Sequence, residues 1–146
     1  MTSRLVVDAS VVLKWRLDDE VLVDAALALR QDFLREGQLE LLAPSLLFYE
    51  MANGLLMAAR RGRISPDQAE SSLSEFGGMG IVLVNPPLSP ILKLAFDLGV
   101  TAYDAAYLAL AQAQGCPLWT ADRELFEAAS PRLTWVRWLG DYPDEG

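Results

Sequence analysis

The sequence contains no histidine and only one cysteine, Cys116. Without histidine the chain has no Ser–His or Cys–His catalytic pair and no histidine-containing zinc site. With a single cysteine it can form no intrachain disulfide, and a reducing compartment is compatible with it. Acid–base or metal chemistry would therefore depend mainly on carboxylate side chains.

Long apolar runs are also missing, because no run reaches the ~18 residues that a membrane helix requires. The first fifteen residues are interrupted by Asp8 and Lys14 and have no small-residue cleavage site, so a signal peptide is not expected. These absences predict a cytoplasmic protein without membrane contact. The net charge of −8 disfavours broad electrostatic binding of nucleic acid, but it is compatible with a local basic patch or with an acidic pocket that a cation neutralises.

The length and composition are those of one globular domain. The 146 residues are 52% hydrophobic and 22% charged. A chain of this length can bury roughly two-thirds of its unfolded surface. Neither an internal repeat nor a low-complexity linker divides the sequence. We therefore predict a single domain that spans residues 1–146.

Short apolar segments alternate with segments of helical periodicity along the chain. Strands are predicted at residues 4–8, 39–44, 81–84 and 117–120, with an edge strand at 133–138. Helices are predicted at residues 9–17, 20–36, 45–61, 65–76, 89–99, 101–114 and 122–129. This alternation predicts an α/β fold with a mainly parallel sheet of four to five strands and helices on both faces. Ligands of such sheets bind at the carboxyl ends of the strands.

Most of the twenty acidic residues fit solvated helix faces, but four stand elsewhere. Asp8 ends the first predicted strand and Asp122 follows the fourth, and each could simply cap the helix that comes next. Asp104 lies in "TAYDAAYLALA", where Thr101 could cap the helix and the acid could meet the positive end of its dipole. Glu50 lies within the apolar segment "LLFYEMANGLL".

Glu50 could occupy the polar stripe of an amphipathic helix, shared with Asn53 one turn later. The alternative is that all four acids converge at one edge of the sheet. Carboxylates gathered within a few Å raise one another's pKa unless a cation neutralises them. An all-carboxylate site suits a hard, oxygen-binding ion such as Mg²⁺ or Mn²⁺.

Four segments, "LVVDASVVLKW", "PSLLFYEMANGL", "AYDAAYLALA" and "LWTADREL", together resemble the PIN-domain ribonucleases, and especially the VapC toxins of bacterial and archaeal toxin–antitoxin pairs. They occur in the family's order and cover residues 5–125. The resemblance implies a three-layer α/β/α fold with a central, mainly parallel sheet, and metal-dependent cleavage of RNA phosphodiester bonds. It assigns catalytic and metal-binding roles to Asp8, Glu50, Asp104 and Asp122, and supporting roles to Ser10, Asn53 and Thr120.

On this interpretation one or two Mg²⁺ or Mn²⁺ ions activate a water and stabilise charge on the phosphate. Glu50 or Asp122 would accept the proton of that water. Candidate RNA contacts are the basic residues Lys14, Arg16, Arg60, Arg61 and Arg63. The arginine cluster could equally be a solvated helix end. The tryptophans that could stack bases, although they are expected in the core, are Trp119, Trp135 and Trp138.

The resemblance further implies two protein partners: a VapB-like antitoxin that occludes the acidic crevice, and a second copy of the chain in a homodimer. A haloacid-dehalogenase phosphatase also begins with a strand that ends in Asp, but it would place a second Asp where Ser10 stands. Two alternatives keep the same fold. One is a non-catalytic PIN-fold binding module, and the other is a housekeeping RNA-processing PIN nuclease.

Overall fold

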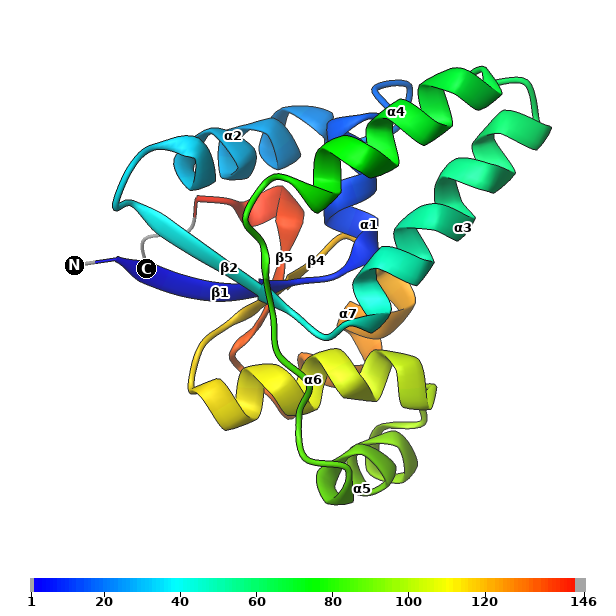
Figure 1. Ribbon diagram of the computed structural model, residues 1–146. Coiled ribbons are helices and arrows are strands. Elements are labelled where there is room, and N and C mark those ends of the chain that lie inside the picture. The colour runs from blue at the N-terminus through cyan, green and yellow to red at the C-terminus, as the bar shows by residue number, and fades with distance from the viewer. Residues whose placement is uncertain (1, 144–146) are drawn as a thin grey trace.

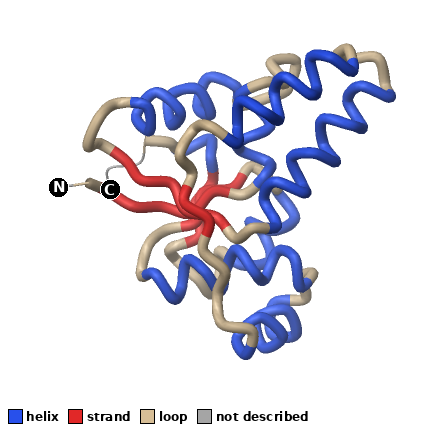
Figure 2. The backbone as a smooth tube through the Cα atoms, in the orientation of Figure 1, coloured by secondary structure: helices blue, strands red, loops and turns tan. Residues whose placement is uncertain are grey.

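The computed structural model describes residues 2–143, which fold as a central sheet between helices (Figure 1, Figure 2). The strands are β1 (Ser3–Val7), β2 (Leu39–Ala43), β3 (Val82–Leu83), β4 (Leu118–Thr120) and β5 (Val136–Trp138). The helices are α1 (Ala9–Val12), α2 (Val23–Leu34), α3 (Leu46–Arg60), α4 (Pro66–Gly77), α5 (Ser89–Leu98), α6 (Ala102–Gln114) and α7 (Arg123–Ala129), with 3₁₀ turns η1 (Leu13–Trp15) and η2 (Leu139–Asp141).

The sheet has the strand order β3-β2-β1-β4-β5, and all four pairings are parallel. In Figure 1, α1, α2 and α4 lie above the sheet, and α5 and α6 lie below it. This arrangement confirms the predicted α/β/α fold with a parallel sheet. It places β1 at the centre, with β2 on one side and β4 on the other.

The central strand carries the core because helices cover both of its faces. Val6 and Val7 are fully buried, as are Leu41 of β2 and Leu118 of β4. A near-continuous apolar run is typical of strands buried on both faces. Val6 pairs with Leu42 on one side and with Leu118 on the other, so the carboxyl ends of β1 and β4 lie together.

The helix starts follow from capping chemistry. Ser65 and Gln68 form the capping box predicted for α4, with Pro66 at its first position. Thr101 caps α6, and its hydroxyl accepts a hydrogen bond from the backbone N–H of Asp104 at 3.1 Å. A cap of this kind contributes about 1 kcal/mol to helix stability.

Three predicted elements differ clearly from those observed. The helix expected at residues 9–17 is α1 followed by the 3₁₀ turn η1, and α2 begins at Val23 rather than near residue 20. Trp15 explains the tight turn, because its buried ring donates a hydrogen bond from Nε1 to the carbonyl of Ala26 at 2.9 Å. The strand expected at 81–84 is the two-residue β3, at the edge of the sheet, and Pro86 soon after it has no N–H to extend pairing.

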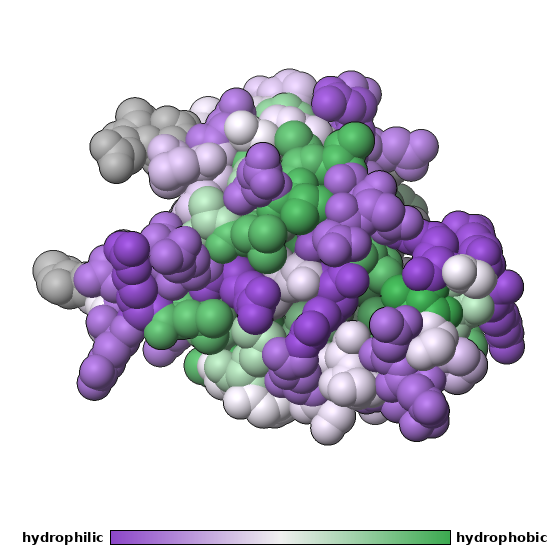
Figure 3. Space-filling view, turned by 90° about the horizontal axis from the view of Figure 1, so that it is seen from above, coloured by the Kyte–Doolittle hydropathy of each residue, from purple (hydrophilic) through white to green (hydrophobic). Residues whose placement is uncertain are grey.

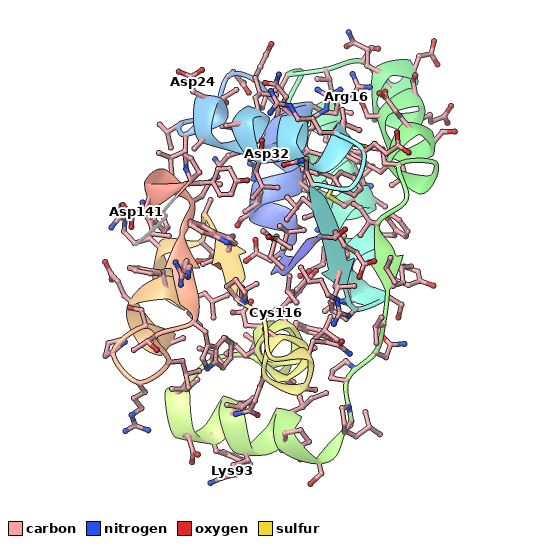
Figure 4. The ribbon with its side chains drawn as sticks, turned by 90° about the vertical axis from the view of Figure 1, so that its left-hand side faces the viewer. Arg16, Asp24, Asp32, Lys93, Cys116 and Asp141 are labelled. Atoms are coloured by element: carbon pink, nitrogen blue, oxygen red, sulfur yellow. The ribbon has the colours of Figure 1, made fainter. Side chains whose placement is uncertain are left out.

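The amino ends of the strands face the viewer in Figure 4, where Cys116 lies between α6 and β4. Cys116 is buried, as expected for a small apolar residue beside a turn. Within residues 2–143, no single helix is long and apolar enough to cross a membrane. One pair, α5 with α6, passes on joint length and composition but is bent by 115°.

Candidate active site

The carboxyl edge of the sheet brings together the ends of β1 and β4 and the first turns of α1, α3, α6 and α7 (Figure 1). Asp8 follows β1 directly and is only 6% exposed. Its Oδ1 accepts a hydrogen bond from the Ser10 hydroxyl at 2.5 Å, and its Oδ2 accepts one from the Thr120 hydroxyl at 2.5 Å. The backbone N–H of Ser10 also donates to Oδ1, at 3.1 Å, so Asp8 caps α1 as well.

The two hydroxyls join the loops that follow β1 and β4. The Ser10 hydroxyl accepts a hydrogen bond from the backbone N–H of Ala121 at 2.8 Å, and that of Thr120 accepts one from the N–H of Asp122 at 3.0 Å. Ser10 and Thr120 therefore stand where supporting residues were expected, and both hold the carboxylate of Asp8.

Asp122 and Asp104 both lie at helix starts, and both keep the capping geometry. Asp122 is the N-cap of α7, where its Oδ1 accepts from the N–H of Leu125 at 3.3 Å. Asp104 lies in the first turn of α6, where its backbone is held by Thr101. The carboxylate of Asp104 is half-buried. A place at a helix start and a place among the site acids are thus compatible for both residues.

Glu50 lies on α3 and reaches α6 through one short hydrogen bond. The hydroxyl of Tyr107 donates to Glu50 Oε1 at 2.5 Å, and the Tyr107 ring is 1% exposed. Asn53, one turn further along α3, is exposed and makes no hydrogen bond to these residues. Tyr107 is a site residue that the sequence reasoning missed. Its spacing of three from Asp104 puts the two on one side of α6 and was the available signal.

The acids perturb one another electrostatically. Burial raises the pKa of Asp8 to about 6, although its hydrogen bonds with Ser10 and Thr120 lower it and the charges of Asp122 and Asp104 raise it further. The pKa of Glu50 is raised by burial, against the effect of the Tyr107 hydrogen bond, and by the charge of Asp122.

For Asp104, burial is again the main cause of a raised pKa, followed by the charges of Asp122 and Glu50. Each of Asp8, Glu50 and Asp104 therefore feels at least one other carboxylate of the predicted set. The four acids are neighbours in space, although they come from four separate segments of the sequence.

The chemistry of these side chains fits a hard cation, because they offer carboxylate oxygens whose mutual repulsion a cation would relieve. Across residues 2–143, however, no three aspartate, glutamate or cysteine side chains are arranged closely enough to hold an ion together. Magnesium commonly binds one or two carboxylates and keeps several waters. The acids lie together at the carboxyl edge of the sheet, an arrangement that suits such partly hydrated binding and does not form a closed cage.

The expected RNA-contacting cations are divided by the fold. Lys14 is buried with its Nζ 3.2 Å from Glu20, and Arg16 pairs with Glu75. Arg63 contacts Asp19 at 2.5 Å as well as Glu20 at 3.1 Å.

Those three charges are therefore directed at carboxylates of the protein itself. Arg60 and Arg61 are exposed and have no ion pair within the described part of the chain. They are the members of the predicted set that remain open to a phosphate.

The fold and the site together define an α/β protein with a group of acidic side chains at the carboxyl edge of a parallel sheet. The PIN domain family model matches residues 5–131. The chain belongs to the PIN-domain family, as its motifs indicated.

Curated relatives place the chain among the VapC proteins of this family. It is 39% identical over 128 residues to Ribonuclease VapC3 of Pyrobaculum aerophilum, covering 85% of this chain and 93% of the relative. It is 38% identical over 110 residues to Exonuclease VapC9 of the same organism, covering 73% and 83%. The crystal structure of PAE2754 from Pyrobaculum aerophilum superposes with a TM-score of 0.68 at 29% identity, covering 95% of this chain and 92% of that one.

Proposed function

We propose that the protein is a VapC-type ribonuclease that hydrolyses RNA phosphodiester bonds with one or two Mg²⁺ or Mn²⁺ ions, and that it is the toxin of a toxin–antitoxin pair. The observation that carries the proposal is the buried carboxylate of Asp8, which faces the charges of Asp104 and Asp122. The VapC ribonucleases to which the chain is similar supply the reaction class.

Asp8, Asp104, Asp122 and Glu50 are the residues that would hold the ions. A bound Mg²⁺ or Mn²⁺ lowers the pKa of its water and stabilises negative charge on a phosphate. Ser10 and Thr120 fix the orientation of Asp8 by hydrogen-bonding both of its oxygens. A carboxylate fixed in this way needs no reorganisation when the substrate arrives.

Glu50 is the better candidate for the general base. Its pKa is raised above the ordinary glutamate value, which brings its basicity closer to neutral pH. The Tyr107 hydroxyl binds one carboxylate oxygen and leaves Oε2 to accept the proton of the attacking water. Asp122 likewise commits one oxygen, to the N–H of Leu125 at the start of α7.

The chemistry is tested by RNA cleavage in Mg²⁺, in Mn²⁺ and in EDTA, with Asp104→Asn beside the wild type. We expect activity in the two metals only, and a loss of about 100-fold or more in the variant. The exposed Asp18→Asn is the matched control, because it removes the same charge from the loop before α2, outside the set of site acids. Full activity of Asp104→Asn, with the helical circular dichroism spectrum unchanged, would remove the site assignment.

A toxin requires an antitoxin, and the grouped carboxylates supply a chemical reason for one. An arginine or lysine of a small partner protein could neutralise the same carboxylates that a cation would. Co-expression with the adjacent reading frame should yield a co-purifying protein that suppresses the ribonuclease activity. A housekeeping nuclease would cleave RNA without such a partner, whereas a non-catalytic module would bind metal without cleaving.

A homodimer is the second expected assembly. Leu92 and Phe96 on α5 are 60% and 82% exposed, and Leu56 on α3 is 43% exposed. Apolar side chains of this size are available for burial between two copies. Sedimentation of the untagged chain should give the mass of two chains, and a strict monomer at all concentrations would contradict the dimer.

A further inference from the structure

One arginine follows a site acid directly in the sequence. Arg123 comes after Asp122 and opens α7, and its side chain is 67% exposed. Its ion pair with Glu127 is 3.8 Å long, and the Glu127 side chain is itself 66% exposed. An ion pair between two side chains so open to water contributes little, and this distance is too long for a hydrogen bond. The guanidinium of Arg123 is therefore available to a ligand.

Helix stability does not explain the arginine at this position. A cation in the first turn of a helix meets the positive end of the helix dipole. The start of α7 would therefore favour a neutral or an acidic side chain over Arg123, and Glu124 in the same turn has the favourable charge. The positive charge of Arg123 needs a reason outside the helix.

The ring of Trp138 holds the guanidinium in place. Arg123 Cζ lies 4.6 Å from the centre of that ring, which is a cation–π contact. The ring is fixed in turn, because Phe126 packs against it with the ring centres 5.5 Å apart. Gly140 lies so close that a Cβ there would be 2.7 Å from the indole Nε1. A long, flexible side chain is thus directed before any ligand arrives, which lowers the cost of binding.

Trp138 stands beside the site in the sheet. It ends β5, and its Cα is the register partner of the Cα of Thr120 at the end of β4. Partners in neighbouring parallel strands direct their side chains to the same face of the sheet. The Trp138 ring therefore lies on the face where Thr120 donates its hydrogen bond to Asp8. Arg123 is held on that face, on the β5 side of the site acids.

Arg123 lies beside the acids without neutralising them. The charges that shift the pKa of Asp8, Glu50 and Asp104 are those of other carboxylates. The guanidinium is therefore set apart from the place where these acids would hold a cation. It is positioned for a phosphate that flanks the reacting one.

The other candidate cations are further from the acids or already paired. Arg60 is ten residues beyond Glu50 on α3, which is about 15 Å along the helix axis. Arg16 and Arg63 pair with carboxylates of the protein. Figure 3 shows the face that carries α2, α3 and α4, and the groove between α3 and α4 is lined mainly by apolar side chains. Arg123 is therefore the cation best placed for a phosphate near the site acids.

We propose that Arg123, held by Trp138, binds a backbone phosphate of RNA next to the phosphate that is cleaved. The proposal rests on the ribonuclease function argued above. A planar guanidinium can donate two hydrogen bonds to a phosphate while its face stays on an aromatic ring. Such a contact fixes the position of the RNA and carries no sequence information. Trp138 is a positioning residue, because it acts through Arg123.

The test is a fluorescence anisotropy titration of labelled single-stranded RNA at several salt concentrations, in EDTA so that no cleavage occurs. Arg123→Ala should weaken binding about tenfold at low salt, equally for oligouridine and oligoadenosine. The slope of the logarithm of the affinity against the logarithm of salt concentration should become shallower by about 0.7 to 1, the loss of one phosphate contact.

Arg35→Ala is the matched control. Arg35 is an exposed arginine at the end of α2, before the amino end of β2 and so at the opposite edge of the sheet. Its removal should leave the affinity and the salt slope within experimental error of the wild type. An equal loss in Arg35→Ala and Arg123→Ala would mean that overall charge governs binding, and it would overturn the proposal.

The role of Trp138 is tested by a double-mutant cycle. Trp138→Phe keeps an aromatic face and should retain the affinity within about threefold. Trp138→Leu should weaken binding about threefold when Arg123 is present and should have no further effect on Arg123→Ala. Losses that add would overturn the positioning role, because the ring would then act through the fold. Arg123→Ala changes an exposed side chain and tests the phosphate contact even if Trp138→Leu does not fold.

Cleavage in Mg²⁺ separates this proposal from the proposed chemistry. A contact made equally to the substrate and to the transition state affects KM and not kcat. Arg123→Ala should therefore raise KM about tenfold with a much smaller effect on kcat, whereas Asp104→Asn should lose kcat. A wild type that neither binds nor cleaves RNA contradicts the ribonuclease function itself. A wild type that does both, with Arg123→Ala at wild-type affinity and salt slope, overturns only the phosphate contact.

Discussion

Replacing Asp8 with asparagine should stabilise the protein at neutral pH while removing its proposed activity. The pKa of Asp8 is about 6 in the folded protein, against 3.8 for an ordinary aspartate. The folded state therefore binds a proton more tightly than the unfolded state. The associated stability is fully present below about pH 3.8 and is lost as the pH rises through about 6.

The size of the pKa shift of Asp8 determines how strongly the free energy of unfolding depends on pH. A raised pKa of this size costs about 3 kcal/mol once Asp8 is fully ionised, and about 1.4 kcal/mol of that cost falls between pH 5 and pH 7.5. The substituted asparagine would carry no charge. Its side-chain oxygen could still cap α1 and accept a hydrogen bond from the Ser10 hydroxyl, and its NH2 group would donate to the Thr120 hydroxyl, which in the wild type donates to Asp8 Oδ2. We expect Asp8→Asn to be more stable than the wild type at pH 7.5, with a smaller difference at pH 5.

The assay is urea denaturation at the two pH values, followed by tryptophan fluorescence, in EDTA so that no cation compensates the charge. Glu50 and Asp104 also have raised pKa values. Their contribution has the same sign in both proteins and largely cancels in the comparison. The exposed Asp18→Asn should leave the pH dependence unaltered. An equal pH dependence in the wild type and Asp8→Asn would refute the reasoning.

Three further changes test other parts of the molecule. Tyr107→Phe should lower the free energy of unfolding by about 1–2 kcal/mol, because the half-buried Glu50 loses its hydrogen-bond donor. Urea denaturation measures this change, and an unchanged free energy of unfolding would contradict a stabilising role of the Tyr107–Glu50 hydrogen bond. Arg60→Glu with Arg61→Glu should weaken RNA binding in low salt, measured by anisotropy, and equal affinity would mark these arginines as a solvated helix end. Gly115→Ala should cost about 1 kcal/mol, read from the thermal midpoint, because its φ of +63° suits glycine; no loss would mean that the turn relaxes.

The placement of the acids could be predicted from the sequence because three of them stand at element boundaries. Asp8 and Asp122 follow buried apolar strands, and a parallel sheet brings such ends to one edge. Thr101 marked the start of the helix that carries Asp104. The adjacency of β1 and β4 was not readable from spacing alone, because strand order depends on how the helices cross over the sheet.

The partners of the charged and hydroxyl groups were harder to predict. The sequence indicated that Lys14 and Arg63 are available to bind RNA. In the structure both form ion pairs with Glu20, which lies in the loop before α2. In the sequence Tyr107 is one more apolar residue of an apolar helix. In the structure its hydroxyl donates a hydrogen bond to Glu50 of α3, more than fifty residues earlier in the chain. Such contacts depend on the packing of distant segments, which local periodicity does not encode.

Asp8 and Asp122 each cap a helix and also belong to the proposed site, which has a consequence for comparing relatives of this protein. Asp122 starts α7, so selection for folding alone would preserve it in a copy that had lost its chemistry. The charges of Asp8 and Glu50 cost stability. A glutamine at position 50 would still accept from Tyr107, and an asparagine at position 8 would still accept from Ser10, although its NH2 group could only donate to the Thr120 hydroxyl. A degenerate relative should therefore drift first to asparagine or serine at position 8 and to glutamine at position 50. Retained acids at those two positions report continued selection for activity, whereas an acid at position 122 reports only a helix start.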